Sequence, residues 1–263
     1  MPKLRVIPVV LLRQGAIVQS RFFSQYQKLG NPFIAVERIS EWDSDELVYL
    51  EISKQFDDPI PGVDLLREIS KRCLVPLSFG GGIKNLSDVD AKIANGADKI
   101  VINSEAIRRP EFITECAHAY GSQCVVISID VKRVGDNSWE VFSNGGTIST
   151  GLESLEWARE AVGRGAGEIL INSIDRDGSM LGYDLDLCEK IIHSIEVPVI
   201  PLGGVGKWED MVMLVSRTGA TAVAAANIFH HQENSVFRAR KFLLEAGLSV
   251  RKPSLTVFEN GNE

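Results

Sequence analysis

Short apolar runs alternate along the chain with longer segments whose apolar residues recur at helical spacing. Residues 75–79 form one such run, and Val63, Leu66 and Ile69 show the helical spacing just before it. Short runs rich in Val and Ile are typical of parallel strands buried on both faces. Eight strands are predicted, at 4–12, 46–52, 75–79, 99–102, 124–130, 168–172, 197–202 and 222–226. Helices are predicted to begin near Pro32, Gly62, Leu86, Pro110, Gly151, Asp184, Lys207 and Asn234.

The second half of the chain repeats the pattern of the first. The segment 75–85 returns at 197–207, and the segment 46–50 returns at 168–172, each after 122 residues. A duplication of this length, with strands and helices alternating in each half, predicts two fused half-barrels and a single (β/α)8 barrel, the TIM-barrel fold. An open doubly wound sheet is the alternative, but it gives no reason for a repeat of four units.

Both copies of the longer segment end a predicted strand in adjacent glycines. These are Gly81-Gly82 in the first copy and Gly203-Gly204 in the second. Glycines let the backbone approach a ligand closely and adopt positive φ, and the amides that open the next helix favour an anion. Each half of the chain therefore predicts one phosphate-binding turn.

Length and charge narrow the class of protein. The 263 residues suit one barrel domain over residues 1–252, and residues 253–263, which lack periodicity, are predicted to be a frayed tail. A net charge of −7 argues against a nucleic-acid partner. No apolar run approaches the ~20 residues that a helix needs to cross a bilayer. The N-terminus shows no secretory signal, so we expect a cytoplasmic protein.

The cysteines give no sign of a metal site or of disulfides. Cys73, Cys116, Cys124 and Cys188 each stand alone in an apolar periodic segment, without metal-ligand spacing. Isolated cysteines of this kind are typical of buried thiols. We therefore expect no metal and no cofactor in this chain.

Three predicted loops after strands are longer than a barrel requires, at 13–31, 132–150 and 175–183. Loops that follow barrel strands form the face where chemistry is found in this architecture. The first of them contains the polar and aromatic segment 21–27, which either closes over a ligand or is a solvated surface loop.

Longer motifs give the chain a family resemblance. Asp130 ends the fifth predicted strand, the run 165–178 surrounds the sixth, and Gly182-Tyr183-Asp184 follows. With the two glycine turns, these motifs closely resemble the cyclase subunit of imidazole glycerol phosphate synthase, over nearly the whole chain. The resemblance implies a barrel that receives ammonia from a glutaminase subunit docked on its N-terminal face. It also implies that the ammonia crosses the barrel and reacts at the C-terminal face with a substrate that carries two phosphates.

The resemblance also implies roles for single residues. Asp130 matches a catalytic aspartate, and Asp98 matches a residue at the glutaminase interface. One implied phosphate site comprises Gly81, Gly82, Asn103 and Ser104. The other comprises Asp177, Gly178, Gly203, Gly204, Ala226 and Asn227. A ring of four charges at the ammonia entrance matches Arg5, Glu46, Lys99 and Glu168, which an ordinary ion-pair cluster would also describe.

The chain departs from the family pattern where the cyclase chemistry takes place. The family uses a second aspartate at the end of strand one, and Leu11 occupies that position here. Gln19 stands where the family has a lysine near the substrate, and Glu51 replaces the aspartate that ends strand two. A leucine cannot exchange a proton, and loss of a positioned acid or base typically removes ~10²- to 10⁴-fold in rate.

Three functions are consistent with this combination. The first is a cyclase-like barrel that passes ammonia from a glutaminase to an ATP-using amidotransferase, which turns a sugar acetamido group into an acetamidino group in bacterial surface-glycan synthesis. The second is a working cyclase subunit in histidine synthesis. The third is a scaffold without catalysis. Loss of the aspartate at Leu11, with the ring residues retained, favours the first.

Overall fold

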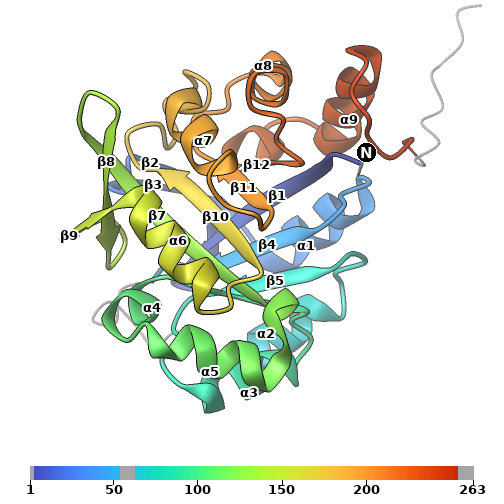
Figure 1. The fold of residues 1–263 in the computed structure, drawn as a ribbon. Coiled ribbons are helices and arrows are strands. Elements are labelled where there is room, and N and C mark those ends of the chain that lie inside the picture. The colour runs from blue at the N-terminus through green and yellow to red at the C-terminus, as the bar shows by residue number, and fades with distance from the viewer. Residues whose placement is uncertain (1–2, 54–62, 254–263) are drawn as a thin grey trace, which may run out of the picture.

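Eight parallel strands follow one another around a closed barrel. The structure, a computed structural model, describes residues 3–53 and 63–253, so the predicted helix start at Gly62 and most of the predicted tail lie outside it. The barrel strands are β1 (Arg5–Arg13), β4 (Leu47–Glu51), β5 (Leu77–Gly80), β6 (Lys99–Ile102), β7 (Val125–Gly135), β10 (Glu168–Ser173), β11 (Val199–Leu202) and β12 (Ala222–Ala225). Neighbours pair in parallel from β1 to β11, β12 lies beside β11, and β12 pairs with β1 (Figure 1). The predicted TIM barrel is confirmed, and the open sheet is wrong.

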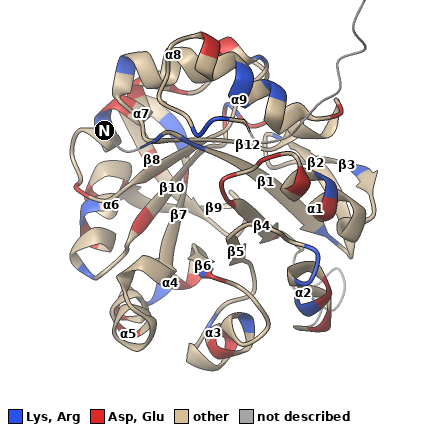
Figure 2. Ribbon diagram, turned by 90° about the vertical axis from the view of Figure 1, so that its right-hand side faces the viewer, with Lys and Arg blue, Asp and Glu red and all other residues tan. Residues whose placement is uncertain are grey.

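Helices surround this barrel (Figure 2). They are α1 (Pro32–Glu41), α2 (Val63–Ser70), α3 (Leu86–Ile93), α4 (Ser104–Arg108), α5 (Glu111–Tyr120), α6 (Ser154–Gly163), α7 (Leu185–Ile192), α8 (Trp208–Thr218) and α9 (Ser235–Glu245), with 3-10 turns η1 (Ser122–Cys124) and η2 (Asn227–His230). None of the helices in the described ranges has the length and apolar character needed to cross a bilayer. The start predicted near Gly151 is wrong, because α6 begins at Ser154, where the Glu153 carboxylate accepts hydrogen bonds from two backbone N–H groups.

Two of the three predicted loops are β-hairpins instead. The first is formed by β2 (Ala16–Arg21) and β3 (Gln25–Gly30), and the second by the end of β7 with β8 (Ser138–Ser143) and β9 (Ile148–Glu153). The two hairpins follow β1 and β7, which are the first and the fifth strand of the barrel. These strands are equivalent in the two halves, so the duplication includes the hairpins. Each continues one wall of the barrel beyond its C-terminal mouth (Figure 1).

The alternation of side chains along the strands divides the apolar core. One buried cluster contains only residues of the sheet, among them Ile7, Val9, Val126 and Leu170, and no helix residue. The intervening residues of the same strands pack against helices in two further clusters. Since successive strand side chains point to opposite faces, the sheet-only cluster fills the barrel interior.

The cysteines are free thiols, as predicted, but only two of them are buried. Cys116 and Cys188 lie in the clusters between sheet and helices. Cys73 and Cys124 are half-buried, because they stand in the turns that lead into β5 and β7.

A buried arginine holds the C-terminal end of the described chain onto the bottom of the barrel. Arg240 of α9 is fully buried, and its guanidinium lies 2.7 Å from an Asp45 carboxylate oxygen and donates to the carbonyl of Asp43. Arg251 binds the same two aspartates at 2.8 and 3.2 Å. Asp45 also accepts a hydrogen bond from the backbone N–H of Val6, so the cluster fixes the start of β1 as well.

We expect Arg240→Met to lower the free energy of unfolding by about 3 kcal/mol, because it removes the fully buried cation of the cluster and leaves only Arg251 to pair with Asp43 and Asp45. Urea unfolding measures this change. Arg238→Met is the matched control, since Arg238 is exposed on the same helix, and its effect should stay within about 0.5 kcal/mol. Equal effects of the two substitutions would contradict the role of the cluster.

Candidate functional site

Four charged side chains close the N-terminal mouth of the barrel. Arg5 of β1 lies 3.0 Å from Glu46 and 2.9 Å from Glu168, and Lys99 of β6 lies 2.9 and 3.0 Å from the same two glutamates. The signs alternate around the ring, so each glutamate meets two cations. The hydroxyl of Ser78 donates a further hydrogen bond to Glu46 at 2.6 Å. The structure thus brings together the four residues predicted from the sequence.

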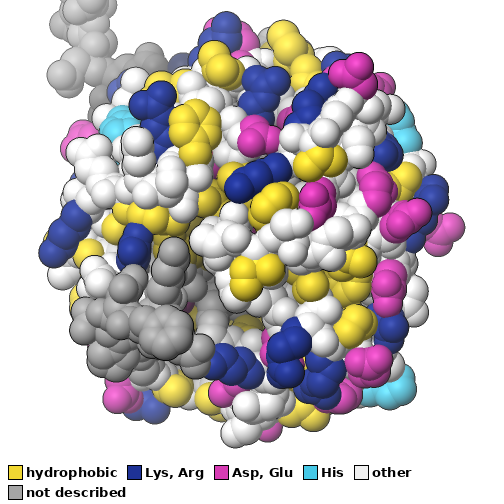
Figure 3. Space-filling view, turned by 90° about the vertical axis from the view of Figure 1, so that its left-hand side faces the viewer, with side chains coloured by type: hydrophobic (Ala, Val, Ile, Leu, Met, Phe, Trp, Pro, Cys, Tyr) yellow, Lys and Arg dark blue, Asp and Glu magenta, His cyan; other side chains and the backbone are white. Residues whose placement is uncertain are grey.

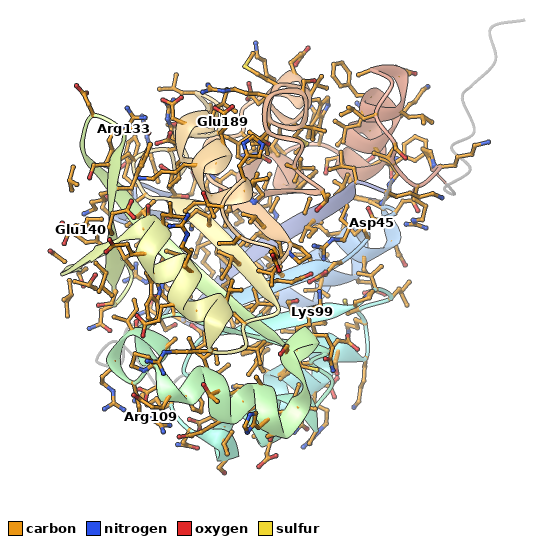
Figure 4. The ribbon with its side chains drawn as sticks, in the orientation of Figure 1. Asp45, Lys99, Arg109, Arg133, Glu140 and Glu189 are labelled. Atoms are coloured by element: carbon orange, nitrogen blue, oxygen red, sulfur yellow. The ribbon has the colours of Figure 1, made fainter. Side chains whose placement is uncertain are left out.

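Apolar side chains line the barrel between this ring and the opposite mouth. Above the ring stand Ile7, Val48, Leu170 and Ile200, with the small side chains of β12 beside them. Lys99 and Asp45 lie toward one end of the barrel, whereas Arg133 and Glu140 lie on the second hairpin at the other end (Figure 4). Apolar side chains therefore fill the middle of the barrel.

Asp130, a residue of β7, lies at the C-terminal mouth of the barrel. One carboxylate oxygen accepts a hydrogen bond from the Asn103 side-chain amide at 2.6 Å, and Ser128 lies 3.4 Å from the other. Burial, together with the charge of Asp177, raises the pKa of Asp130 to about 7, although the hydrogen bonds to its carboxylate act in the opposite direction. Such a carboxyl group is present in both protonation states at neutral pH, which suits a general acid or base.

Leu11 faces the interior near the end of β1, where the family pattern has its second aspartate. It is a neighbour of Leu50 in β4 and of Val18 in β2, and it belongs to the interior apolar cluster. Its surroundings therefore suit a hydrocarbon side chain. No acid or base stands at this place in the site.

The two glycine turns keep a two-fold relation in detail. Gly81 and Gly203 have φ values of 107° and 103°, which favour glycine. A Cβ atom on Gly81 would meet the carbonyl of Glu51, and one on Gly203 would lie 2.9 Å from the carbonyl of Ser173. The chain thus passes so close to the preceding strand end that only glycine fits in either half.

The first hairpin is docked on residues assigned to the second phosphate site. The Ser20 hydroxyl donates to the Asp177 carboxylate at 2.6 Å, and the N–H of Phe23 donates to the same oxygen at 3.1 Å. The side-chain amide of Asn227 donates to the Ser20 carbonyl at 2.9 Å. These bonds hold the hairpin over this side of the mouth, although most side chains of the segment 21–27 remain exposed to solvent.

The second hairpin reaches the first phosphate site in the same way. The N–H of Asn144 at its tip donates to the Ser104 hydroxyl at 3.0 Å. Beside it, a Cβ atom on Gly146 would lie 3.1 Å from Phe23 and 3.0 Å from Ile174. The two hairpins consequently meet over the mouth.

Several buried polar atoms at the mouth have no hydrogen-bond partner among the residues that the structure describes. They include the side-chain oxygens of Asn103, Asn172, Ser173 and Asn227. Buried polar atoms are nearly always satisfied in folded proteins, so these four are available to a polar ligand or to water. Asn103 and Asn227 were predicted to bind phosphate, and their placement beside the glycine turns is consistent with that assignment.

The remaining predicted positions lie where the sequence suggested, but with other contacts. Asp98 is exposed before β6, and its carboxylate accepts the Leu77 N–H at 2.8 Å. Gln19 pairs with Gln27 inside the first hairpin. Glu51 is buried, which raises its pKa, and it accepts the N–H of Ser53 at 2.7 Å.

Comparison with known proteins decides the family. A family described as histidine biosynthesis protein matches residues 5–235. The chain belongs to this family. It is 39% identical over 251 residues to imidazole glycerol phosphate synthase subunit HisF of Streptococcus mutans, which covers 95% of this chain and 100% of the relative. The protein of the same name from Streptococcus gordonii is 37% identical over the same shares, and that from Clostridium botulinum is 40% identical over 94% of this chain and 98% of the relative.

Sequence reasoning missed several residues of this family member's site. Ser20 and Asn144 hold the hairpins on Asp177 and Ser104, and the Arg13 guanidinium lies over the ring of Tyr26, 4.3 Å from its centroid. Polar residues in loops of unknown geometry gave no pattern that could identify them. Asn172 was missed as well, although its place near the end of β10, where it is the partner of Asp130, could have indicated it.

The raised pKa of Asp130 predicts how stability depends on pH. The folded chain binds a proton at Asp130 that the unfolded chain has lost between about pH 4 and pH 7, so this group makes stability fall as pH rises through that range. Asp130→Asn removes the effect. We expect the variant to gain about 4 kcal/mol over the parent between pH 4 and pH 8 in urea unfolding. Asp136→Asn, an exposed residue of the second hairpin, is the control, and a parallel gain there would contradict the assignment.

Proposed function

We propose that this chain is the ammonia-conducting barrel subunit of a glutamine-dependent amidotransferase complex, with its own cyclase chemistry impaired. A glutaminase would dock at the N-terminal mouth, outside the ring of Arg5, Glu46, Lys99 and Glu168. An ATP-using amidotransferase would consume the ammonia and turn a sugar acetamido group into an acetamidino group in surface-glycan synthesis. The complex would work in the cytoplasm, where glutamine and ATP are available.

Leu11 carries this proposal. The charged ring and the apolar interior would serve the passage of ammonia, whereas cyclisation needs a proton donor and acceptor at the C-terminal mouth. Leu11 removes one of that pair and leaves Asp130 alone. The parts that conduct are thus separated from the parts that react, as a change of downstream acceptor would require.

A working cyclase subunit in histidine synthesis is the second candidate. Two observations favour it: the chain shares 37–40% identity with HisF subunits over nearly its whole length, and Asp130 has a pKa of about 7. In this case Asp130 and a second group would share the proton transfers. Free ammonia supplied to the chain separates the two candidates.

We expect the purified chain to show very weak cyclase turnover with the family's substrate and excess ammonia, which makes a glutaminase unnecessary. Leu11→Asp restores the carboxylate and should raise the rate by about 10²-fold or more. Leu11→Asn is the matched control, because asparagine is polar and of the same size as aspartate but cannot take a proton at neutral pH. A parent turnover near one per second, within the ordinary enzyme range, would show that the chain is a cyclase.

We also expect Lys99→Ala to separate glutamine hydrolysis from amidation in the assembled complex. The substitution opens the ring, since Lys99 binds both glutamates, and ammonia then escapes to solvent. Glutamine consumption should continue, amidation should fall, and added ammonium should restore it. Arg217→Ala, which breaks an exposed ion pair on α8, is the control. An unchanged ratio of glutamine consumed to acceptor amidated, in an intact complex, would exclude the barrel interior as the route.

A further inference from the structure

Exposed apolar side chains gather at the C-terminal mouth of the barrel. Nine large apolar residues are exposed within the described ranges, and five of them stand on the hairpins and loops that follow barrel strands. These five, which we call the apolar rim, are Phe22, Val134, Ile148, Met180 and Leu181. The face that carries them shows apolar and basic side chains close together (Figure 3). Exposed apolar groups that are gathered in this way are typical of a protein interface.

Contacts between the loops join these residues into one surface. Phe22 donates its N–H to the Asp177 carbonyl at 3.0 Å, which ties the first hairpin to the loop that carries Met180. On the other side, Gly146 stands two residues before Ile148 and lies against Phe23. The rim therefore runs across the mouth from the second hairpin, over the first, to the loop after β10.

Unpaired cations flank this rim. Arg21 and Lys207 are exposed and Arg176 is half-buried, and none of the three has a carboxylate within ion-pair distance among the residues described. Most other arginines of the chain do have one, and the chain as a whole carries −7. The nearest exposed acid on the same loop, Asp175, accepts the N–H of Arg133 at 2.8 Å. The end of the rim at Phe22, Met180 and Leu181 therefore complements an apolar patch bordered by carboxylates, whereas Val134 at the other end lies near the exposed Asp136.

We propose that the apolar rim is the docking surface for the ATP-using amidotransferase, through an apolar patch on that enzyme with carboxylates around it. The inference rests on the proposed function, because it places the consumer of ammonia at the end of the barrel opposite the charged ring. A protein seated there would exclude water and receive ammonia directly. A second copy of this chain fits poorly, since a symmetric contact would set Arg21, Arg176 and Lys207 against their own copies.

The chain offers a closely matched pair of variants for the test. Met180 and Met213 are both 57% exposed, and Leu181 and Leu74 are 74% and 70% exposed, but Met213 and Leu74 lie away from the C-terminal mouth. The rim variant carries Met180→Glu and Leu181→Glu, and the control carries Met213→Glu and Leu74→Glu. Both variants replace one methionine and one leucine with glutamate, so they add the same charge.

The measurement is calorimetric binding of the source organism's ATP-using amidotransferase to the full chain, without glutamine or glutaminase. We expect the rim variant to raise the Kd by about tenfold or more, and the control to leave it unchanged. Binding by the parent should also weaken with added salt, because the cations contribute. Equal losses in both variants, no loss in the rim variant, or no binding by the parent would each overturn the proposal. A parent dimer that the rim variant dissociates would do so too.

A second readout keeps this surface distinct from the proposed function. Glutamine-dependent amidation is measured with the parent chain in the complete assembly. If it proceeds while the rim variant binds as tightly as the parent, the function stands and the docking surface is wrong. If the rim variant fails to bind and the parent shows no coupling of glutamine to amidation, the surface stands and the function is wrong.

Discussion

Two buried glutamates set a condition that the rest of the barrel satisfies. The side chains of Glu46 and Glu168 are 4% and 10% exposed, and a carboxylate so far from water needs cations close to it. Arg5 and Lys99 each bind both glutamates, so the four side chains hold strands β1, β4, β6 and β10 together at one level. The pairing that stabilises the barrel also makes its bottom a constriction, because the alternating charges leave no wide opening between them.

The upper end of the barrel depends on an exchange between the halves. The hairpin of the first half donates from Ser20 to Asp177 in the second, and the hairpin of the second half donates from Asn144 to Ser104 in the first. Each half therefore contacts residues of the predicted phosphate site of the other. Neither of these two sites keeps its present surroundings without the opposite half, which gives a physical reason why the duplicated units form one barrel.

The sequence predicted those parts of the fold that rest on local pattern. Strands buried on both faces leave apolar runs, and close backbone approach demands glycine at Gly81 and Gly203. Both features could therefore be recognised in the sequence. The hairpins were taken for loops because β3 and β9 are largely exposed and polar and show no strand pattern. The repeat relates Glu46 to Glu168, but it places Ala222 opposite Lys99, so only the family resemblance indicated the cations. The contact between Ser20 and Asp177 spans 157 residues and follows from tertiary packing alone.

Leu11 and Asp130 together determine what the C-terminal mouth can do with ammonia. A second carboxylate at the end of β1 would add negative charge close to Asp130 and would attract ammonium. With Leu11 there, Asp130 has no second carboxylate beside it at the end of β1, and burial raises its pKa to about 7, so this acid is partly uncharged at neutral pH. An apolar wall with a weakly charged acid retains a small neutral base less strongly than a pair of carboxylates would. Leu11 in place of a carboxylate therefore makes the mouth less able to retain a cation such as ammonium.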